Sequence, residues 1–131
     1  FQVHLPPSIN TKEIKIAPML LQPLIENSIW HGLATKEGDR KLELKIAKES
    51  NMIKIAVADN GIGRKQAQLL KNKSGHQSQA IDNLRERIMY YKPTVDSQLS
   101  LVEIEDLTDA NGIACGTRCT IYFPLNPVTL F

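Results

Sequence analysis

Residues 41–59 alternate between apolar and polar side chains on both sides of a short turn, and this pattern constrains the fold most strongly. Apolar residues occupy every second position from Leu42 to Ile46 and again from Ile53 to Val57, with Glu49-Ser50-Asn51 between the two runs. A period of two is typical of a strand with one face on the core. The segment is therefore predicted to form an antiparallel hairpin with one buried and one solvated face.

Two amphipathic helices are predicted to cover the buried face of that hairpin. The first ends near Gly32, a plausible C-terminal cap. It starts at Pro18 and kinks at Pro23, or it starts at Pro23, because a proline inside a helix removes a backbone hydrogen bond. The second runs from about residue 78 to residue 91. Their apolar stripes are Leu21, Leu24, Ile25, Ser28 and Gly32 in the first helix and Ile81, Leu84, Ile88 and Tyr91 in the second.

The remaining segments complete an α+β fold. Strands are predicted at residues 98–104 and 117–123, shorter extended pieces at residues 1–5 and 13–16, and a short helix near residues 65–70. Helices gathered with such strands predict a two-layer α/β sandwich, with a mixed, mostly antiparallel sheet and helices on one face.

Composition excludes several classes of protein. The chain has 131 residues, is 42% hydrophobic and has a net charge of +2, as expected of one folded domain and not of a disordered chain. So weak a positive charge argues against a nucleic-acid binder, and no apolar run is long enough to span a bilayer. Cys115 and Cys119 are too few for a disulfide scaffold or a four-cysteine zinc site, and we expect both thiols to be at least half-buried.

Two polar residues fall on the apolar face of predicted strands, each at a strand end. Asp59 shares the face of Ile53 to Val57, where a carboxylate is unfavourable unless it accepts hydrogen bonds. It is followed by Asn60-Gly61-Ile62-Gly63, whose glycines allow a ligand to approach the backbone closely. An adenine amine would satisfy the carboxylate, whereas an ordinary strand-to-turn corner is the alternative interpretation. Thr117, after Gly116, likewise enters an apolar layer, although a buried threonine commonly bonds the backbone.

The polar side of the first helix and the start of the second are candidate phosphate and metal sites. The amide oxygen of Asn27 suits magnesium, which prefers oxygen ligands and keeps waters and phosphate oxygens. The alternative is that Glu26, Asn27, Trp30 and His31 form the solvated face of the helix. The free N–H groups near Ser78 form a natural phosphate seat.

Four segments, in order, resemble one family. Residues 21–32 resemble the N box of the LytS-like sensor histidine kinases, and residues 57–63 resemble their G1 box. Residues 83–88 resemble the helix after the ATP lid, and residues 116–124 resemble the closing strand. The resemblance extends from about residue 16 to residue 124.

This resemblance implies the Bergerat fold of the GHKL superfamily, with ATP between the helical layer and a mobile lid. It implies that Asn27 holds Mg²⁺, that Asp59 binds the adenine amine, that Gly61 and Gly63 shape the pocket floor, and that Thr117 supports Asp59. The candidate ATP-binding residues are Asn27, Trp30, His31, Asp59, Asn60, Gly61, Ile62, Gly63, Ser78, Gln79, Ala80 and Thr117, with Asn27 also the candidate metal ligand.

The chain departs from the family pattern at three places. Ser78-Gln79-Ala80 stands where the family often has Gly-x-Gly, and Trp30 stands where a lysine is often found. Glu26, the one candidate catalytic residue, is not at the position of the general base in the hydrolytic members, so strong ATPase activity is not expected.

The resemblance also predicts how the chain is used. His4, His31 and His76 are not in the context of the kinases' acceptor histidine, so residues 1–131 are expected to be a single ATP-binding domain from a longer sensor kinase. Such a domain would lie in the cytoplasm, anchored to the membrane through other segments, and present the γ-phosphoryl to a separate dimerisation domain that serves a response regulator. A degenerate GHKL domain acting as an interaction module and an anti-sigma-type serine kinase are the alternatives.

Overall fold

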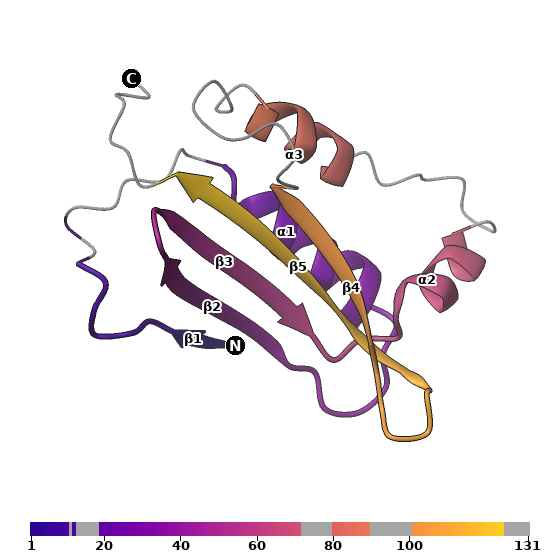
Figure 1. The fold of residues 1–131 in the computed structure, drawn as a ribbon. Coiled ribbons are helices and arrows are strands. Elements are labelled where there is room, and N and C mark those ends of the chain that lie inside the picture. The colour runs from indigo at the N-terminus through magenta and orange to yellow at the C-terminus, as the bar shows by residue number, and fades with distance from the viewer. Residues whose placement is uncertain (11, 13–18, 72–79, 90–100, 125–131) are drawn as a thin grey trace.

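The computed structural model describes residues 1–10, 12, 19–71, 80–89 and 101–124. In these residues five strands form one sheet in the order β1-β2-β3-β5-β4 (Figure 1). β1 is parallel to β2, and the other neighbouring strands are antiparallel. The strands are β1 (Gln2–His4), β2 (Leu42–Glu49), β3 (Met52–Asp59), β4 (Val102–Thr108) and β5 (Ala114–Pro124), and the helices are α1 (Gln22–Asn27), η1 (Ser28–Leu33), α2 (Arg64–Lys71) and α3 (Ala80–Met89).

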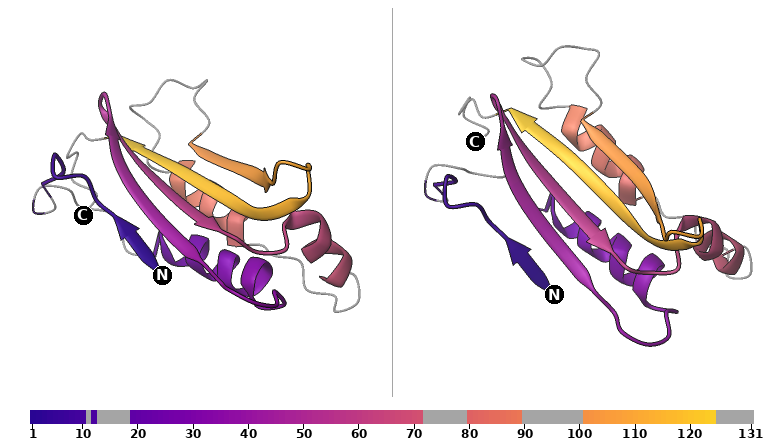
Figure 2. Two further views of the ribbon diagram at one scale, coloured as in Figure 1. Left: turned by 90° about the horizontal axis from the view of Figure 1, so that it is seen from below. Right: turned by 60° about the horizontal axis from the view of Figure 1, so that its bottom comes forward.

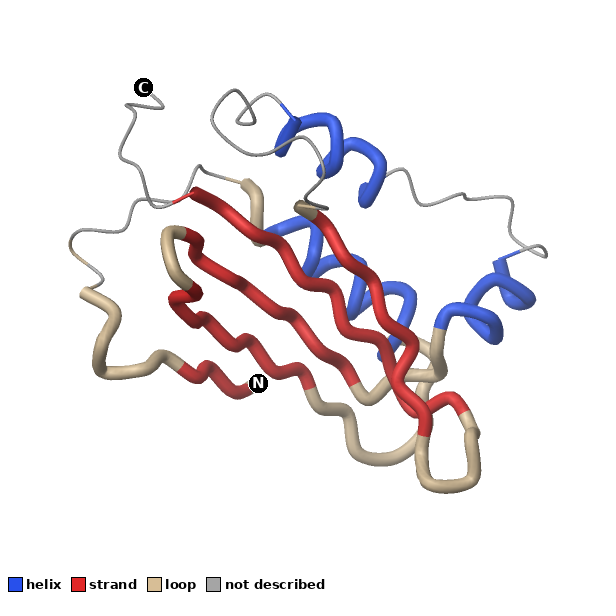
Figure 3. The backbone as a smooth tube through the Cα atoms, viewed as in Figure 1, coloured by secondary structure: helices blue, strands red, loops and turns tan. Residues whose placement is uncertain are grey.

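The helices form a layer on one side of this sheet. Figure 2 shows α1 and α3 beneath the strands, with α2 beyond the end of β3, and Figure 3 shows the opposite face free of helices. The predicted α+β architecture, a mostly antiparallel sheet with helices on one face, is confirmed. None of the described helices is long and apolar enough to cross a membrane.

The core forms between the sheet and the helices, on the face that the alternating pattern predicts. Ile55 and Val57 of β3 are completely buried, as are Leu24 of α1 and Leu84 of α3. β2 pairs with β3 over their whole lengths, and Ser50 makes the turn with a φ of 53°. The predicted antiparallel hairpin is therefore confirmed.

The first helix agrees with one of its two predicted starts but differs from the prediction at its C-terminal end. α1 begins at Gln22 with Pro23 in its first turn, which supports the alternative start near Pro23. Pro18 lies outside the described residues. The helix continues without a break into the wider π-helical turns of η1, which end at Leu33. The prediction that Gly32 caps the helix is wrong, because Gly32 lies inside η1 and lacks the positive φ of a capping glycine.

Several other boundaries shift. β4 extends to Thr108 and β5 already begins at Ala114. Residues 13–16, 78–79, 90–91 and 98–100 of the predicted elements lie outside the described part, so the predicted ends of α3 are not tested. Cys119 is buried as expected, but Cys115 is exposed, which corrects that prediction.

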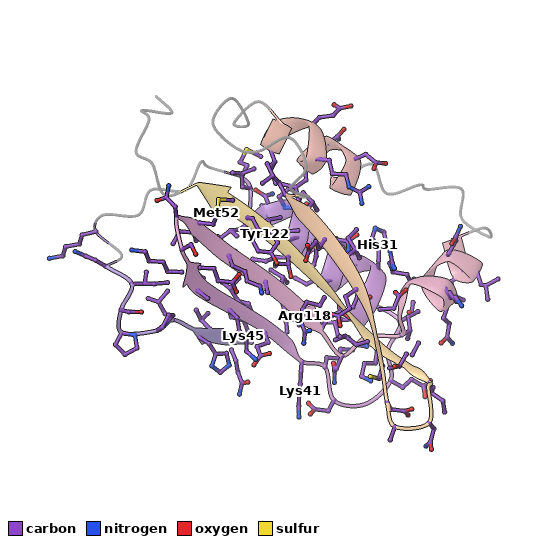
Figure 4. All side chains as sticks on the ribbon, in the orientation of Figure 1. His31, Lys41, Lys45, Met52, Arg118 and Tyr122 are labelled. Atoms are coloured by element: carbon purple, nitrogen blue, oxygen red, sulfur yellow. The ribbon has the colours of Figure 1, made fainter. Side chains whose placement is uncertain are left out.

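The opposite face of the sheet carries charged and polar side chains that contact one another across neighbouring strands. Figure 4 shows Lys45, Met52, Arg118 and Tyr122 toward the viewer and His31 on the helical side. The Arg118 guanidinium donates to Glu105 at 2.9 Å, and the Lys54 ammonium lies 5.6 Å from the centre of the Tyr122 ring. These contacts hold long side chains over a sheet face that the described helices do not cover.

Candidate functional site

Asp59 is the centre of the candidate site. It is the last residue of β3 and pairs with Leu42 of β2 and Thr117 of β5. Its side chain faces the helices, and only 4% of its surface is exposed. The placement therefore agrees with the sequence-based expectation of a carboxylate on the apolar face.

Three donors surround the Asp59 carboxylate. The Gly61 N–H donates to Oδ1 at 2.9 Å, and the Ser28 hydroxyl and the Thr117 N–H also donate to the carboxylate. Burial raises the pKa of Asp59 above its ordinary value, and these donors act in the opposite direction, with burial the larger effect. The site thus holds a carboxylate that is desolvated but hydrogen-bonded.

This raised pKa predicts how the stability of the ligand-free protein depends on pH. The folded state binds the Asp59 proton more tightly than the unfolded state, so the contribution of Asp59 to stability is complete below the unfolded pKa. It decreases as the pH rises through the folded pKa. Urea unfolding from about pH 4 to pH 8 should show this decrease in the wild type and not in Asp59→Asn. Identical pH profiles for the two proteins would contradict the assignment.

Three glycines let the backbone pack closely around Asp59. A Cβ on Gly32 would lie 2.6 Å from Asp59 Oδ1, and a Cβ on Gly61 would collide with the Gly32 backbone. Gly116, with a φ of 144°, has no room for a Cβ because the Asp59 carbonyl occupies that space. A side chain at any of these three positions would therefore displace Asp59 or the backbone next to it.

The π-helical turns of η1 bring Ser28 and Gly32 to the end of the sheet. The Gly32 carbonyl accepts from the Ile62 N–H at 3.1 Å, which ties η1 to the segment after β3. Ser28 is 3% exposed. The sequence places Ser28 in the apolar stripe of the first helix but gives it no role in the site. A serine among apolar residues was the signal that could have identified it as a partner of Asp59.

The polar residues of the first helix differ in their surroundings. Glu26 is exposed and accepts from the Gln22 side-chain amide at 2.6 Å. Asn27 and His31 are half-buried, whereas Trp30 is 69% exposed. In the described part of the chain, no group of three or more histidine, cysteine, aspartate or glutamate residues is arranged to hold a metal ion.

The remaining candidates divide into three groups. The Asn60 side chain bonds the backbone of Asp39 and Lys41. Gly63 has a φ of 80° and precedes α2 directly. Ala80 is the first residue of α3, and Ser78 and Gln79 lie outside the described residues.

The sequence did not predict the ion pair between Arg64 and Asp106. The Arg64 guanidinium donates to both carboxylate oxygens, at 2.6 and 2.7 Å. This contact lowers the pKa of Asp106 and ties the start of α2 to β4. Because 42 residues separate the partners, no local pattern reveals the pair.

Comparison with known proteins identifies relatives for part of the chain, although no protein-family model matches it. Over 85 residues the chain is 36% identical to the sensor protein LytS of Oceanobacillus iheyensis. This match covers 59% of this chain and 14% of LytS. Over 68 residues the chain is 37% identical to the sensor protein kinase HptS of Staphylococcus aureus. This match covers 52% of this chain and 13% of HptS. The matched part is thus a small fraction of either relative.

A solved structure has the same fold. The histidine kinase domain of the Erythrobacter litoralis EL346 blue-light activated histidine kinase superposes with a TM-score of 0.53 at 15% identity, over 81% of this chain and 44% of that one. At that identity the likeness concerns the fold alone. The sequence matches show that part of this chain is similar to the LytS and HptS sensor kinases.

Proposed function

We propose that the chain binds Mg-ATP as the ATP-binding domain of a sensor histidine kinase and presents the γ-phosphoryl to a histidine of another domain. The observation that carries the proposal is the buried carboxylate of Asp59, which lies against Gly32 and accepts a hydrogen bond from the Gly61 N–H. The relation to LytS and HptS supports the kinase class.

The hydrogen bonds of Asp59 favour adenine as the ligand. A carboxylate offers about four acceptor positions, and Gly61, Ser28 and Thr117 supply three donors. The exocyclic amine of adenine would be the fourth donor, whereas guanine presents an oxygen at the same position. The donors also favour the ionised carboxylate, which accepts from the amine more strongly than a neutral group would.

The half-buried Asn27 would hold magnesium through its amide oxygen. It directly precedes Ser28, whose hydroxyl donates to Asp59. An amide oxygen fits a cation that keeps waters and phosphate oxygens, and the ion supplies charge neutralisation during phosphoryl transfer.

The protein's own contribution would be positioning. The Asp59 carboxylate and the glycine floor fix the base, and Thr117 supports Asp59 through its N–H. Phosphoryl transfer requires little covalent chemistry from the protein, so no catalytic role is proposed for the exposed Glu26. The remaining parts of the proposal are an acceptor-histidine dimerisation domain, a response regulator, and membrane anchoring of the whole kinase with this domain in the cytoplasm.

Calorimetric titration of the 131-residue chain with Mg-ATP, Mg-ADP and Mg-GTP tests the proposal. We expect saturable heat with both adenine nucleotides and binding of Mg-GTP at least about tenfold weaker, because a misplaced acceptor leaves buried polar groups unpaired. Trp30 fluorescence, followed on the same sample, gives a second signal close to Asn27. The absence of heat at millimolar nucleotide would contradict the proposal and favour the degenerate interaction module.

A further inference from the structure

We propose that Asn60 is a positioning residue that holds the Gly61 N–H against the Asp59 carboxylate by fastening the end of β3 to residues 39–41. This inference rests on the proposed function and gives Asn60 a role that involves no contact with the nucleotide. Residues 39–41, between η1 and β2, become part of the site through it.

Three hydrogen bonds join Asn60 to that segment. The Lys41 N–H donates to Asn60 Oδ1 at 2.7 Å, and Asn60 Nδ2 donates to the Asp39 carbonyl at 3.0 Å. The Asn60 N–H donates to the Lys41 carbonyl at 3.2 Å. Both polar atoms of the side chain therefore have backbone partners in residues 39–41.

A second attachment lies two residues further along. The Ile62 N–H donates to the Gly32 carbonyl at 3.1 Å, which fixes the chain to η1. Gly61 lies between the two attachments and donates to Asp59 Oδ1. Because Gly61 restricts its own φ and ψ less than any other residue, the orientation of its N–H depends on its fixed neighbours.

Only an amide matches the partners of this side chain. The Lys41 N–H requires an acceptor and the Asp39 carbonyl requires a donor, and asparagine provides both. An aspartate of the same size would place an acceptor against the Asp39 carbonyl. An alanine would leave both backbone groups without this partner.

The hydrogen bond from the Lys41 N–H to Asn60 Oδ1 can be removed by a substitution at either residue, which permits a double-mutant cycle. Asn60→Ala removes the side chain, and Lys41→Pro removes the N–H that donates to it. Asn60→Ala should weaken Mg-ATP binding about tenfold and Lys41→Pro by no more than that, and the double variant should bind about as weakly as Asn60→Ala, because the bond that Lys41→Pro removes is one of the two that Asn60→Ala removes. Lys41→Ala keeps the backbone N–H and is the matched control, with affinity within about twofold of wild type. Additive losses would overturn the proposal.

A second measurement needs no nucleotide. Carboxyl ¹³C NMR titration of Asp59 should show a higher pKa in Asn60→Ala than in wild type, and the Gly61 amide should exchange faster with solvent. A merely structural role would leave both values unchanged, and that result would overturn the proposal even if Mg-ATP binding weakened. If the wild type bound no nucleotide, the proposed function would fail while the NMR values still decided the role of Asn60.

Discussion

Asp59→Asn is expected to weaken Mg-ATP binding about a hundredfold, because it removes the charge from a buried acceptor and places an amide donor near the adenine amine. In the wild type, the Gly61, Ser28 and Thr117 donors all converge on the carboxylate. The neutral amide has one acceptor oxygen for these donors and the ligand together. The loss should appear in calorimetry as a higher Kd for ATP and ADP alike, since both carry the same base.

Controls separate this loss from unfolding. The Asp59→Asn protein should retain a cooperative urea transition, because the amide occupies nearly the same volume as the carboxyl. Thr117→Ala removes the hydroxyl but keeps the N–H that donates to Asp59, so its effect on binding should be smaller. Unchanged nucleotide affinity in a folded Asp59→Asn protein would refute the assignment of Asp59 as the adenine-binding group.

The hairpin and the position of Asp59 follow from periodicity. A shift of one residue in the register of β3 would turn Ile53, Ile55 and Val57 toward solvent, so their burial fixes the register. The same register puts Asp59 on the helical side. A strict period of two therefore predicted both the strand pairing and the buried carboxylate.

Other features depend on contacts between distant parts of the chain. Gly32 near the end of a helical pattern suggested a cap, yet its actual role is close approach to Asp59, and a glycine in a sequence does not distinguish the two. The π-helical geometry of η1 and the pair of Arg64 with Asp106 have no periodic signal. Likewise, Asn60 follows Asp59 in a motif typical of nucleotide binding, whereas its hydrogen bonds go to residues 39–41.

Gly61→Ala is the second substitution for which we expect a large effect, because it should lower both the stability of the fold and the affinity for Mg-ATP. An added Cβ would collide with the Gly32 carbonyl group and Cα, and backbone held in η1 has little freedom to move away. The free energy of unfolding should decrease by about 3 kcal/mol, at the upper end for overpacked interiors. The Gly61 N–H would also move away from Asp59 Oδ1, so Mg-ATP binding should be lost together with stability.

Gly112→Ala, in the turn between β4 and β5, is the matched control, because no described atom beyond its chain neighbours lies within 4 Å of its added Cβ and its φ of 75° is the source of strain. It should cost about 1 kcal/mol and leave nucleotide affinity unchanged. Gly61 lacks a positive φ, so any excess loss in Gly61→Ala measures the steric contact between the β3 end and η1. Equal losses in the two variants, determined by urea unfolding, would show that this contact is not close. The proposal that close backbone packing at Gly61 shapes the adenine site would then lose its main support.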